Sequence, residues 1–486
     1  MDLNKIKKIY MIGIKGVGMT MLAQYLKNIG MEVSGSDIDE VFMTDEVLLK
    51  SNIKVFKGFS ESNIPTDVDL IVYSTAYNEK NNPELAFALS LKHKIMKYAE
   101  ALGLVFNQKH GIAVIGSHGK TTTSAWLGYV MDKSGKSPSV MVGARVPQFD
   151  GASLNGHSSY LIIEADEYQN KLQYFNPKIV LLNNIDYDHP DYFPTEESYV
   201  RVFIDFIQKI SAKGFLVANF DDKFIRKIAN VNCKGRVVSY AINESADYMA
   251  YDIKQEGDRQ IFKVKLGVDN FDDQDDTSFA EASAVEVGEF SIQLSGKHSI
   301  YNALAVIATC AELEIDLVDI RTHLENFEGT ARRMQTMGQF RGATIIDDYA
   351  HHPTEIKATL AGARQKYGDK KIKVVFHPHT FTRTKALIDD FATSFGDADE
   401  LIVLDIYGSA REEQGGVHSK DLVGKIVKQL DRQLVCKPKN FHLQKVKHIP
   451  TLAECEAYLR GDIDRGDIVI LMGAGDIFRI GENLVK

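Results

Sequence analysis

The sequence is poor in cysteine, and its four cysteines form no pattern. Cys233, Cys310, Cys436 and Cys455 are scattered over 486 residues, without the spacing that metal-binding or disulfide-rich domains show. We expect them to be buried, reduced thiols, as is usual in a cytosolic protein. Neither a disulfide scaffold nor a cysteine-bound metal is therefore expected to organise this chain.

Long apolar runs and an excess of positive charge are also missing. No segment reaches the length that spans a membrane, and the apolar part of the N-terminal MDLNKIKKIYMIGI reads as a short strand rather than a signal peptide. The net charge of −9 argues against a nucleic-acid binder, which usually presents a basic face. We expect a cytoplasmic protein with no membrane insertion and no nucleic-acid partner.

Length and composition favour a soluble chain of several domains. A chain of 486 residues is too long for one ordinary domain, so two or three are expected. Its apolar share of 44% and charged share of 25% are those of soluble globular proteins. No internal repeat or low-complexity segment stands out.

Short apolar runs, separated by helical stretches, recur along the whole chain. They are apolar throughout rather than alternating, which indicates strands buried on both faces of parallel sheets. Ten such runs are IYMIGI, DLIVYST, IAVIGS, YLIIEAD, KIVLLNNID, GFLVANF, ATIIDDYA, IKVVFHPH, ELIVLDIYG and DIVILMGAGD. The sequence thus predicts an α/β fold, in which ligands bind at the carboxyl ends of the strands.

Three domains can be separated along the chain, over residues 1–108, 109–327 and 328–486. Within the second, residues 247–294 are acidic and alternating, which predicts a small antiparallel section with an exposed acidic loop, DNFDDQDDTS. This loop lacks the Gly and the terminal Glu of a calcium loop, so we expect it to be solvated rather than to bind a cation.

The most informative segment is IAVIGSHGKTTTSAWLGYVM, residues 112–131. An apolar strand leads into glycines and then into a helix, which is the layout of a phosphate-binding loop, although only two residues separate Gly116 from Gly119 instead of four. Lys120 can reach a terminal phosphate, and the Thr121 hydroxyl can hold magnesium. As an exposed loop residue, Lys120 should contribute little to stability.

A second glycine-rich turn follows the first strand of the chain. Gly13, Gly16 and Gly18 are spaced GxxGxG, the reverse of the dinucleotide fingerprint, and Asp37 ends the next strand, where a ribose-binding acid would stand. The turn suits a diphosphate at a helix N-terminus. Taken alone it would suggest an NAD enzyme, and that signal is weak.

Acidic and imidazole side chains follow two strands of the second domain, and these groups are plausible magnesium ligands beside a phosphate loop. They are Glu164, Asp166, Glu167, Asp186, Asp188 and His189, together with Asn183 and Asn184. Turn chemistry and solvation explain at least half of the four carboxylates Asp166, Glu167, Asp186 and Asp188. His298 and Asn302 share one face at the start of a later helix, where capping is the alternative explanation.

The third domain holds three loops dense in histidine, arginine and aspartate. Arginine there can neutralise charge that develops on a phosphate. The residues are Arg332 and Arg333 in GTARRMQ, Asp347, Asp348, His351, His352 and Glu355 in IIDDYAHHPTEI, and His377, His379 and Arg383 in VVFHPHTFTRTKAL. We expect these loops to form one wall of an active site that faces the phosphate loop.

Together these motifs resemble the Mur ligase family of ATP-dependent amide-forming ligases, over essentially the whole chain and in the family's order. GIKGVGM with SGSD is similar to the family's UDP-sugar site, GSHGKTTT to its ATP loop, and EADEY with NNIDYDHPDYF to its metal-binding region. GKHSIYNALA is similar to its adenine-contact helix, and GTARRMQ with DDYAHHPTEI to the start of its C-terminal domain. PHTFTRT and YGSARE resemble one branch of these ligases.

The resemblance implies a Rossmann-like N-terminal domain for a UDP-sugar, a central P-loop-type ATPase domain and a Rossmann-like C-terminal domain that closes over both. It implies ATP-dependent joining of L-alanine to the lactyl carboxylate of UDP-N-acetylmuramate through an acyl phosphate, with magnesium. Tyr168, Thr380 and Ser117 depart from parts of the family pattern, and EADEY with Tyr168 keeps murein tripeptide open as the alternative amino substrate.

The resemblance also implies a role for each site residue. Substrate contacts are Gly13, Gly16, Val17, Gly18, Asp37, Ser74, Thr75, His379 and Arg383. ATP contacts are Gly116, Ser117, His118, Gly119, Lys120, Thr121, Thr122, Asn184, His298, Asn302, Arg332 and Asp347. Metal ligands are Thr121, Glu164 and His189, and the catalytic residues are Lys120, Arg332, His352 and Arg383, where His352 could equally be a structural loop histidine.

Two further classes of function stay open. An NAD-dependent oxidoreductase would use the first glycine-rich turn, but it leaves the second phosphate loop unexplained. A nucleotide-binding regulator without catalysis would not need the arginine- and histidine-rich loops of the third domain. We expect a monomer or a weak homodimer.

Overall fold

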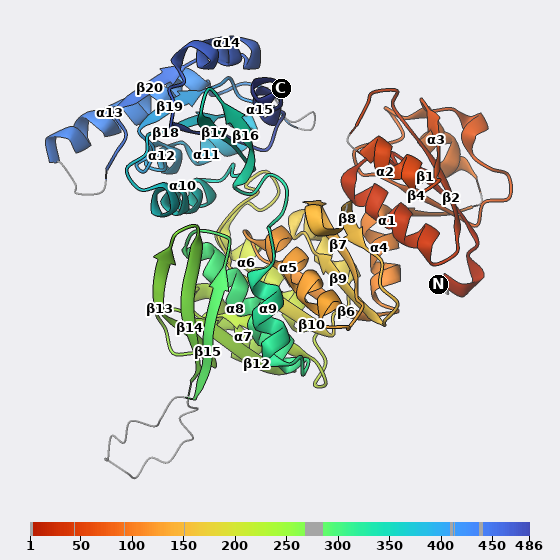
Figure 1. Cartoon of the computed structure of the whole chain (residues 1–486). Helices are drawn as coiled ribbons and strands as arrows, with labels where there is room; N and C mark the ends of the chain where they lie inside the picture. Colours follow the sequence, from red (N-terminus) through yellow and green to blue (C-terminus); the bar gives the residue numbers. More distant parts are fainter. Residues whose placement is uncertain are drawn as a thin grey trace.

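The structure is a computed structural model that describes residues 3–42, 44–91, 93–149, 151–267, 285–408, 412, 414–436 and 441–486. Its elements form three α/β units, each built around one sheet. In Figure 1 the N-terminal unit (red) and the C-terminal unit (blue) both stand on the central unit (orange to green). The predicted three-domain α/β fold class is confirmed, with parallel strands dominating every sheet.

The N-terminal unit is a fully parallel sheet of five strands in the order β3-β2-β1-β4-β5. Its strands are β1 (Lys8–Ile12), β2 (Glu32–Asp37), β3 (Lys54–Lys57), β4 (Leu70–Tyr73) and β5 (Lys94–Lys97), and its helices are α1 (Val17–Asn28), α2 (Thr44–Lys50), α3 (Pro83–Ser90) and α4 (Tyr98–Phe106). Short 3-10 turns cover Leu3–Lys5 and Glu61–Asn63. Helix α1 packs against the central unit, where the Ser153 hydroxyl donates to Gln24.

The central unit is a sheet of ten strands in the order β15-β14-β13-β12-β11-β10-β6-β9-β7-β8. The strands are β6 (His110–Ile115), β7 (Ser139–Val146), β8 (Gly151–Leu154), β9 (Tyr160–Glu164), β10 (Ile179–Leu182), β11 (Phe215–Asn219), β12 (Arg236–Ala241), β13 (Tyr248–Glu256), β14 (Arg259–Leu266) and β15 (Glu286–Ile292). The β13–β14–β15 and β7–β8 pairs are antiparallel, and the others are parallel. The predicted antiparallel section is thus confirmed, while its loop DNFDDQDDTS lies outside the described residues.

Helices cover both faces of the central sheet. They are α5 (Lys120–Lys133), α6 (Glu196–Ile207), α7 (Lys223–Asn232), α8 (Lys297–Glu312) and α9 (Leu317–Glu325), with 3-10 segments η3 (Pro147–Phe149) and η4 (Tyr168–Tyr174). Along β6, Ile112 and Val114 join the core under α5 and α8, whereas Ala113 and Ile115 join the core under α6 and α7. A strand buried on both faces needs apolar residues at every position, which is why this run does not alternate.

The single tryptophan of the chain lies at the centre of the α5 side of this core. Trp126 is completely buried and stacks on Phe327, with ring centroids 5.2 Å apart. Its indole N–H donates to the carbonyl of Leu324 at 3.2 Å. The helix that begins at the phosphate loop is therefore fixed to the end of the central unit.

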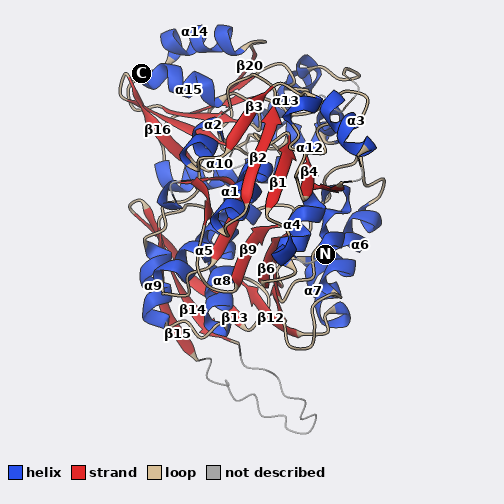
Figure 2. Cartoon of the chain, turned by 90° about the vertical axis from the view of Figure 1, so that its right-hand side faces the viewer, coloured by secondary structure: helices blue, strands red, loops and turns tan. Residues whose placement is uncertain are grey.

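The C-terminal unit has six strands in the order β16-β17-β21-β18-β19-β20, of which only the β16–β17 pair is antiparallel among the described residues. The strands are β16 (Gln335–Phe340), β17 (Ala343–Asp348), β18 (Ile372–Phe376), β19 (Glu400–Val403), β20 (Lys445–His448) and β21 (Ile468–Met472). The helices are α10 (Pro353–Tyr367), α11 (Phe381–Ala386), α12 (Ile388–Ala392), α13 (Ser419–Cys436), α14 (Leu452–Asp462) and α15 (Phe478–Val485). Helices α10, α12 and α13 cover one face of the sheet, and α14 and α15 cover the other. Figure 2 shows the same chain turned by 90°, so that the right-hand side of Figure 1 faces the viewer.

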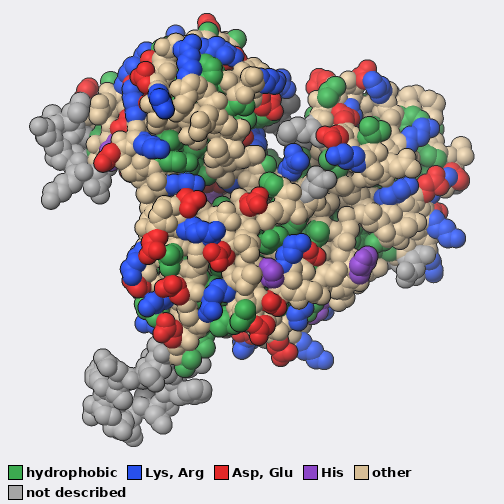
Figure 3. Space-filling view, in the orientation of Figure 1, with side chains coloured by type: hydrophobic (Ala, Val, Ile, Leu, Met, Phe, Trp, Pro, Cys, Tyr) green, Lys and Arg blue, Asp and Glu red, His purple; other side chains and the backbone are tan. Residues whose placement is uncertain are grey.

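The ten predicted apolar runs each overlap a strand of the structure, from β1 to β21. Cys310 and Cys455 are buried free thiols and Cys233 is a half-buried one, while the side chain of Cys436 lies outside the described residues. Among the described residues, no helix combines the length and the apolar character needed to cross a membrane. On the face in Figure 3, acidic and basic side chains are interspersed, and a notch separates the N-terminal and C-terminal units.

Candidate active site

The phosphate loop connects the end of β6 to the start of α5 and requires glycine at two points. Gly116 and Gly119 have φ of 129° and 79°, a region that glycine adopts most readily. A Cβ at Gly119 would lie 2.7 Å from Oδ1 of Asn302, and one at Gly116 would lie 2.9 Å from the carbonyl of Asn184. The loop therefore lies directly against β10 and the start of α8.

Asn184, which follows β10, braces this loop. Its side-chain oxygen accepts from the backbone N–H of His118 at 2.8 Å, and its amide donates to the His118 carbonyl at 3.1 Å. The Ser117 hydroxyl in turn accepts from the N–H of Asp186 at 2.8 Å. The structure thus gives Asn184 a loop contact in addition to its place on the cavity wall.

Lys120 is not an exposed loop residue, so that expectation was wrong. Its side chain is only 13% exposed and forms an ion pair with Glu167, which is 2% exposed, at 3.2 Å. It also donates to the carbonyls of Gly116 and Ser117. Burial alone would lower the pKa of Lys120, but Glu167 and the neighbouring carboxylates raise it, so the ammonium stays charged.

Thr121 and Glu164 meet at the first turn of α5. The threonine hydroxyl donates to the carboxylate, with oxygens 2.8 and 2.9 Å apart, and the Gly143 N–H donates to the same carboxylate at 2.7 Å. An oxygen pair of this kind beside a phosphate loop suits a hard divalent cation.

A second group suited to a cation lies next to Lys120. Ligand atoms of Asp166, Glu167 and His189 fall within 4.8 Å of one another, and His189 Nε2 is 3.9 Å from Glu167. Glu167 and Asp188 are buried, so solvation does not explain these two carboxylates. Asp166 accepts from the Tyr168 N–H at 3.0 Å, which is the turn chemistry anticipated from the sequence.

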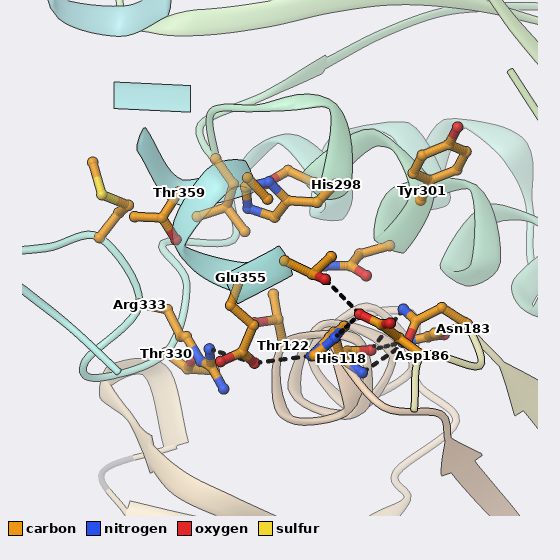
Figure 4. Close-up of a pocket in the computed structure, with 18 of the residues that line it drawn as sticks. His118, Thr122, Asn183, Asp186, His298, Tyr301, Thr330, Arg333, Glu355 and Thr359 are labelled. Atoms are coloured by element: carbon orange, nitrogen blue, oxygen red, sulfur yellow. Dashed lines mark hydrogen bonds and ion pairs between the residues drawn. The ribbon is translucent and has the colours of Figure 1, made fainter. Parts of the chain in front are cut away.

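A cavity of about 450 Å³ opens beside the loop, between the central and C-terminal units. Figure 4 shows side chains of the phosphate loop, of the start of α8 and of α10 pointing into it. Six of the predicted ATP contacts line this cavity: His118, Gly119, Thr122, Asn184, His298 and Asn302. Asn183, Asp186, Arg333, Asp348 and Glu355, which the sequence also singled out, line it as well. Asp222, Ser299, Tyr301, Thr330, Met334 and Thr359 also line it and were not singled out, although Ser299 and Tyr301 stand in the motif that contains His298 and Asn302.

Several buried polar atoms on the cavity wall have no hydrogen-bond partner within the described chain. They are Nδ1 of His298, Oδ1 of Asn183 and Oγ1 of Thr330. Burial lowers the pKa of His298 to about 4, so its ring is neutral and presents one acceptor nitrogen. Such atoms fit a bound polar heterocycle such as the base of a nucleotide.

His118 of the phosphate loop connects the two units. Its Nε2 lies 2.9 Å from Asp186, and its Nδ1 lies 3.3 Å from Glu355 of α10, as the dashed lines of Figure 4 indicate. Burial lowers the pKa of His118, but the hydrogen bonds to these two carboxylates outweigh burial and raise it to about 9. The Thr354 hydroxyl also donates to Asp186, at 2.5 Å.

The two adjacent arginines of GTARRMQ have different surroundings. Arg333 lines the cavity and lies 3.6 Å from Glu355. Arg332 instead pairs with Asp347 at 3.0 Å and donates to the Gly473 carbonyl at 2.7 Å, inside the C-terminal unit. Burial raises the pKa of Asp347 to about 6 in spite of this arginine.

Three further predicted residues lie on the loops of the C-terminal unit. His352 caps α10, accepting from the Thr354 N–H, and its ring lies 5.0 Å from that of His118. Arg383 of α11 pairs with Asp188 of the central unit. His379 stacks on Tyr407, and burial lowers the pKa of His379 to about 4. Each of the three loops contacts the central unit: the Ala331 N–H donates to the Arg145 carbonyl, Thr354 and Glu355 contact Asp186 and His118, and Arg383 contacts Asp188.

The predicted glycine-rich turn of the N-terminal unit has an aromatic neighbour at each end. A Cβ at Gly13 would lie 2.7 Å from the ring of Tyr77, and one at Gly18 would lie 2.7 Å from the ring of Tyr98. Asp37 does end β2, where its carboxylate accepts from the N–H groups of Lys15 and Ile38 and from the Tyr77 hydroxyl. Gly16 and the half-exposed Val17 open α1 at the same turn.

A second cavity, of about 530 Å³, lies between the N-terminal and central units. Thr75 lines it, next to Ser74, whose N–H donates to the carbonyl that ends β1. Tyrosines and lysines from both units contribute to the wall: Tyr73, Tyr77, Lys97 and Tyr98 from one, and Lys171, Tyr174 and Tyr192 from the other. This second cavity thus adjoins the glycine-rich turn, while the first adjoins the phosphate loop.

Comparison with known families gives a match over each of the three units. Residues 8–110 match "Mur ligase family, catalytic domain", residues 114–310 match "Mur ligase middle domain", and residues 332–475 match "Mur ligase, glutamate ligase domain". Together these segments account for most of the chain.

Individual proteins match over the full length. The chain is 37% identical to a UDP-N-acetylmuramate–L-alanine ligase of Desulfitobacterium hafniense, over 98% of this chain and 99% of that protein. It is 38% identical to the ligase of the same name from Alkaliphilus metalliredigens, over 100% and 98%. Among solved structures, UDP-N-acetylmuramate-alanine ligase from Thermotoga maritima superposes with a TM-score of 0.78 at 25% identity, and a murein peptide ligase from Psychrobacter arcticus with 0.69 at 22%, each over 98% of both chains.

Proposed function

This chain belongs to the Mur ligase family, and we propose that it joins L-alanine to UDP-N-acetylmuramate at the expense of ATP in peptidoglycan synthesis. Curated relatives that carry this activity in their names match it over nearly their whole length, so each domain of those enzymes has a counterpart here. The likeness to the murein peptide ligase is at 22% identity and concerns the fold alone.

One observation supports this proposal more than any other. The cavity beside the phosphate loop is walled on one side by His118 and Asn302 and on the other by Arg333 and Glu355 of the C-terminal unit. A nucleotide bound there would have its terminal phosphate between a phosphate loop and cationic side chains, as phosphoryl transfer requires.

The reaction begins with activation of a carboxylate, which is a poor electrophile in water. The lactyl carboxylate of the UDP-sugar attacks the γ-phosphorus of ATP and forms an acyl phosphate, while ADP leaves. The neutral amine of L-alanine then attacks the acyl carbon, the amide forms, and phosphate leaves. The protein contributes chiefly position and charge stabilisation.

Within this scheme, Lys120 holds the β- and γ-phosphates, and it exchanges its pairing with Glu167 for them. Arg333 and Arg383 supply positive charge on the C-terminal side, where transferred phosphoryl and substrate charge accumulate. Arg332 adds to this positive charge from its place against Asp347. His298, Asn302 and Asn184 contact the adenine, because their amide and imidazole groups line the cavity. We assign His352 to orienting L-alanine or accepting its proton.

Magnesium fits two groups of this structure. Thr121 with Glu164 offers oxygen ligands at the phosphate loop, and His189 with its neighbouring carboxylates offers a mixed set. When bound, such ions would offset the repulsion between an anionic nucleophile and an anionic phosphoryl group.

The N-terminal unit is the proposed UDP-sugar domain. Gly13, Gly16, Val17 and Gly18 would face the diphosphate, Asp37, Ser74 and Thr75 the nucleoside side, and His379 with Arg383 the far end of the sugar. The proposed borders of the three domains lie near residues 108 and 327. We also propose the cytoplasm as the site of action, because the reaction needs a compartment in which ATP is maintained.

The test is phosphate release from ATP in the presence of UDP-N-acetylmuramate and magnesium, with L-alanine, L-serine, glycine or murein tripeptide added in turn. We expect turnover that needs both the UDP-sugar and L-alanine. Turnover with the tripeptide only would instead assign the chain to the recycling reaction. No turnover with any of them would contradict the proposal and favour a nucleotide-binding regulator.

A further inference from the structure

His189, the predicted metal ligand that follows β10, has an unusual backbone conformation. Its φ is 57°, in the left-handed region that is uncommon for residues other than glycine, although histidine is one of the side chains that adopt it more often. Its own N–H donates to the Asp188 carboxylate at 2.7 Å, and its carbonyl accepts from the N–H groups of Tyr192 and Phe193 at 2.9 Å. These bonds fix the backbone of the turn, but they leave the direction of the imidazole undetermined.

The imidazole of His189 packs against one aromatic ring. Tyr168, the first residue of η4, lies with its ring centroid 4.6 Å from that of His189 and its plane tilted by 34°. The Tyr168 hydroxyl donates to Asp191 at 2.7 Å, two residues after the histidine. The tyrosine ring is thus attached to the chain at one end and to the histidine turn at the other, which restricts the rotation of the imidazole.

The resulting direction of the imidazole brings its Nε2 towards the phosphate loop. That atom lies 3.9 Å from Glu167 and 3.8 Å from Asp188, and Glu167 itself pairs with Lys120. Ligand nitrogens need such an orienting contact because an imidazole that rotates freely loses its place in a coordination shell. Residues that orient a metal ligand typically affect metal affinity about 10- to 100-fold when they are replaced.

We propose that Tyr168 is a positioning residue that aims the His189 imidazole at a divalent cation beside the phosphate loop. This inference rests on the proposed function, in which His189 is a metal ligand. It assigns the tyrosine of the EADEY motif to the metal region rather than to the choice of amino substrate. The contact of the Tyr168 ring contributes most to the orientation of the imidazole, and the hydrogen bond from its hydroxyl to Asp191 contributes less.

The experiment is a titration of the full-length protein with Mn²⁺ in the presence of a non-hydrolysable ATP analogue, with free Mn²⁺ followed by EPR. We expect Tyr168→Leu to weaken Mn²⁺ binding about tenfold and Tyr168→Phe, which keeps the ring, to weaken it less than about threefold. The affinity for the analogue without metal should stay unchanged in both, which also reports that the variants are folded.

A matched control is available on the preceding strand. Tyr160 at the start of β9 packs edge-on against His110, with centroids 5.0 Å apart, and is thus a second tyrosine–histidine pair outside the site. Tyr160→Leu should leave Mn²⁺ affinity unchanged. If Tyr160→Leu weakened Mn²⁺ binding as much as Tyr168→Leu does, the loss of any tyrosine ring would weaken the site. That result would overturn the inference.

The double variant separates positioning from general damage. If Tyr168 acts through His189, then Tyr168→Leu should produce no further loss of Mn²⁺ affinity in a His189→Ala background. An equal loss in both backgrounds would overturn the inference while leaving the ligase assignment intact. Unchanged Mn²⁺ binding in His189→Ala alone would instead remove the histidine from the metal site, and with it the role of Tyr168, whether or not the protein ligates L-alanine.

Discussion

Arg383 and Asp188 form a two-pronged ion pair between the C-terminal and central units. Nε of the arginine lies 3.2 Å from one carboxylate oxygen, and Nη2 lies 3.3 Å from the other. Both side chains are less than a tenth exposed. Burial alone would raise the pKa of Asp188, but Arg383 and the nearby histidines together outweigh burial and hold this pKa well below its ordinary range. The arginine is thereby held next to His189, which follows Asp188 in the chain.

The first prediction concerns this arginine. Replacing Arg383 with Ala should lower kcat about 100-fold or more, with a smaller change in KM for the UDP-sugar, because a cation that acts in the transition state is lost. Steady-state kinetics with L-alanine saturating would measure both constants. Arg383→Lys keeps the charge without the two-pronged fork and should recover only part of kcat. An effect confined to KM would mean that Arg383 only binds substrate.

The second prediction concerns the buried pair of Lys120 and Glu167. Lys120→Ala should abolish ligation and also lower the free energy of unfolding by about 3 kcal/mol, because it leaves a buried carboxylate unpaired. Urea denaturation would measure the loss. Adding Glu167→Gln to Lys120→Ala should recover part of this stability. Lys133→Ala, which removes an exposed lysine at the other end of α5, should change stability little.

The third prediction is that the free energy of unfolding depends on pH because His118 titrates. Its pKa is raised from 6.5 to about 9 in the folded chain, so the protonated ring stabilises the fold fully below pH 6.5. That contribution, about 3 kcal/mol at most, is lost as the pH rises through 9. The unfolding free energy of the wild type, minus that of His118→Gln, should therefore fall between pH 6.5 and 9. A difference that stays constant over this range would show that Asp186 and Glu355 do not hold the proton.

The fourth prediction compares two glycines at opposite ends of α5. Gly119 and Gly135 have nearly equal φ, 79° and 78°, but only at Gly119 would an added methyl group meet another atom, Oδ1 of Asn302 at 2.7 Å. Both alanine variants should lose about 1–2 kcal/mol of stability from left-handed strain. Only Gly119→Ala should also weaken ATP binding, measured by calorimetry. Equal ATP affinities in the two variants would contradict the importance of the contact with Asn302.

Much of the fold could be predicted because it depends on local signals. The run Ile112–Ile115 is apolar at every position, and a strand between two helical layers needs that pattern. The glycines at 116 and 119 stand where the backbone turns to positive φ. The antiparallel section also had a local signal, since β13 alternates in exposure along its length: buried with half-buried residues at its start, and exposed with half-buried residues from Asp252 on.

Other parts of the site depend on contacts between distant segments, which spacing does not reveal. Lys120 read as exposed because its partner Glu167 is 47 residues away. Arg332 and Arg333 are adjacent in the sequence and identical in type, so the sequence cannot tell them apart. In the structure, Arg332 pairs with Asp347 inside the C-terminal unit, whereas Arg333 faces the cavity. Glu355 reaches His118 across 237 residues. The local sequence pattern thus predicts which residue types the site contains. Which of these residues contact one another is decided by the packing of distant segments and domains.

Trp126, buried beneath the phosphate-loop helix, provides the protein with a built-in optical probe. Because it is the only indole in the chain, its emission reports a single location, the stack on Phe327 and the bond to Leu324. A shift of that emission to longer wavelength would mark the opening of the central unit specifically. Melting of the outer two units before it would leave the tryptophan emission unchanged, so their melting must be followed by circular dichroism instead.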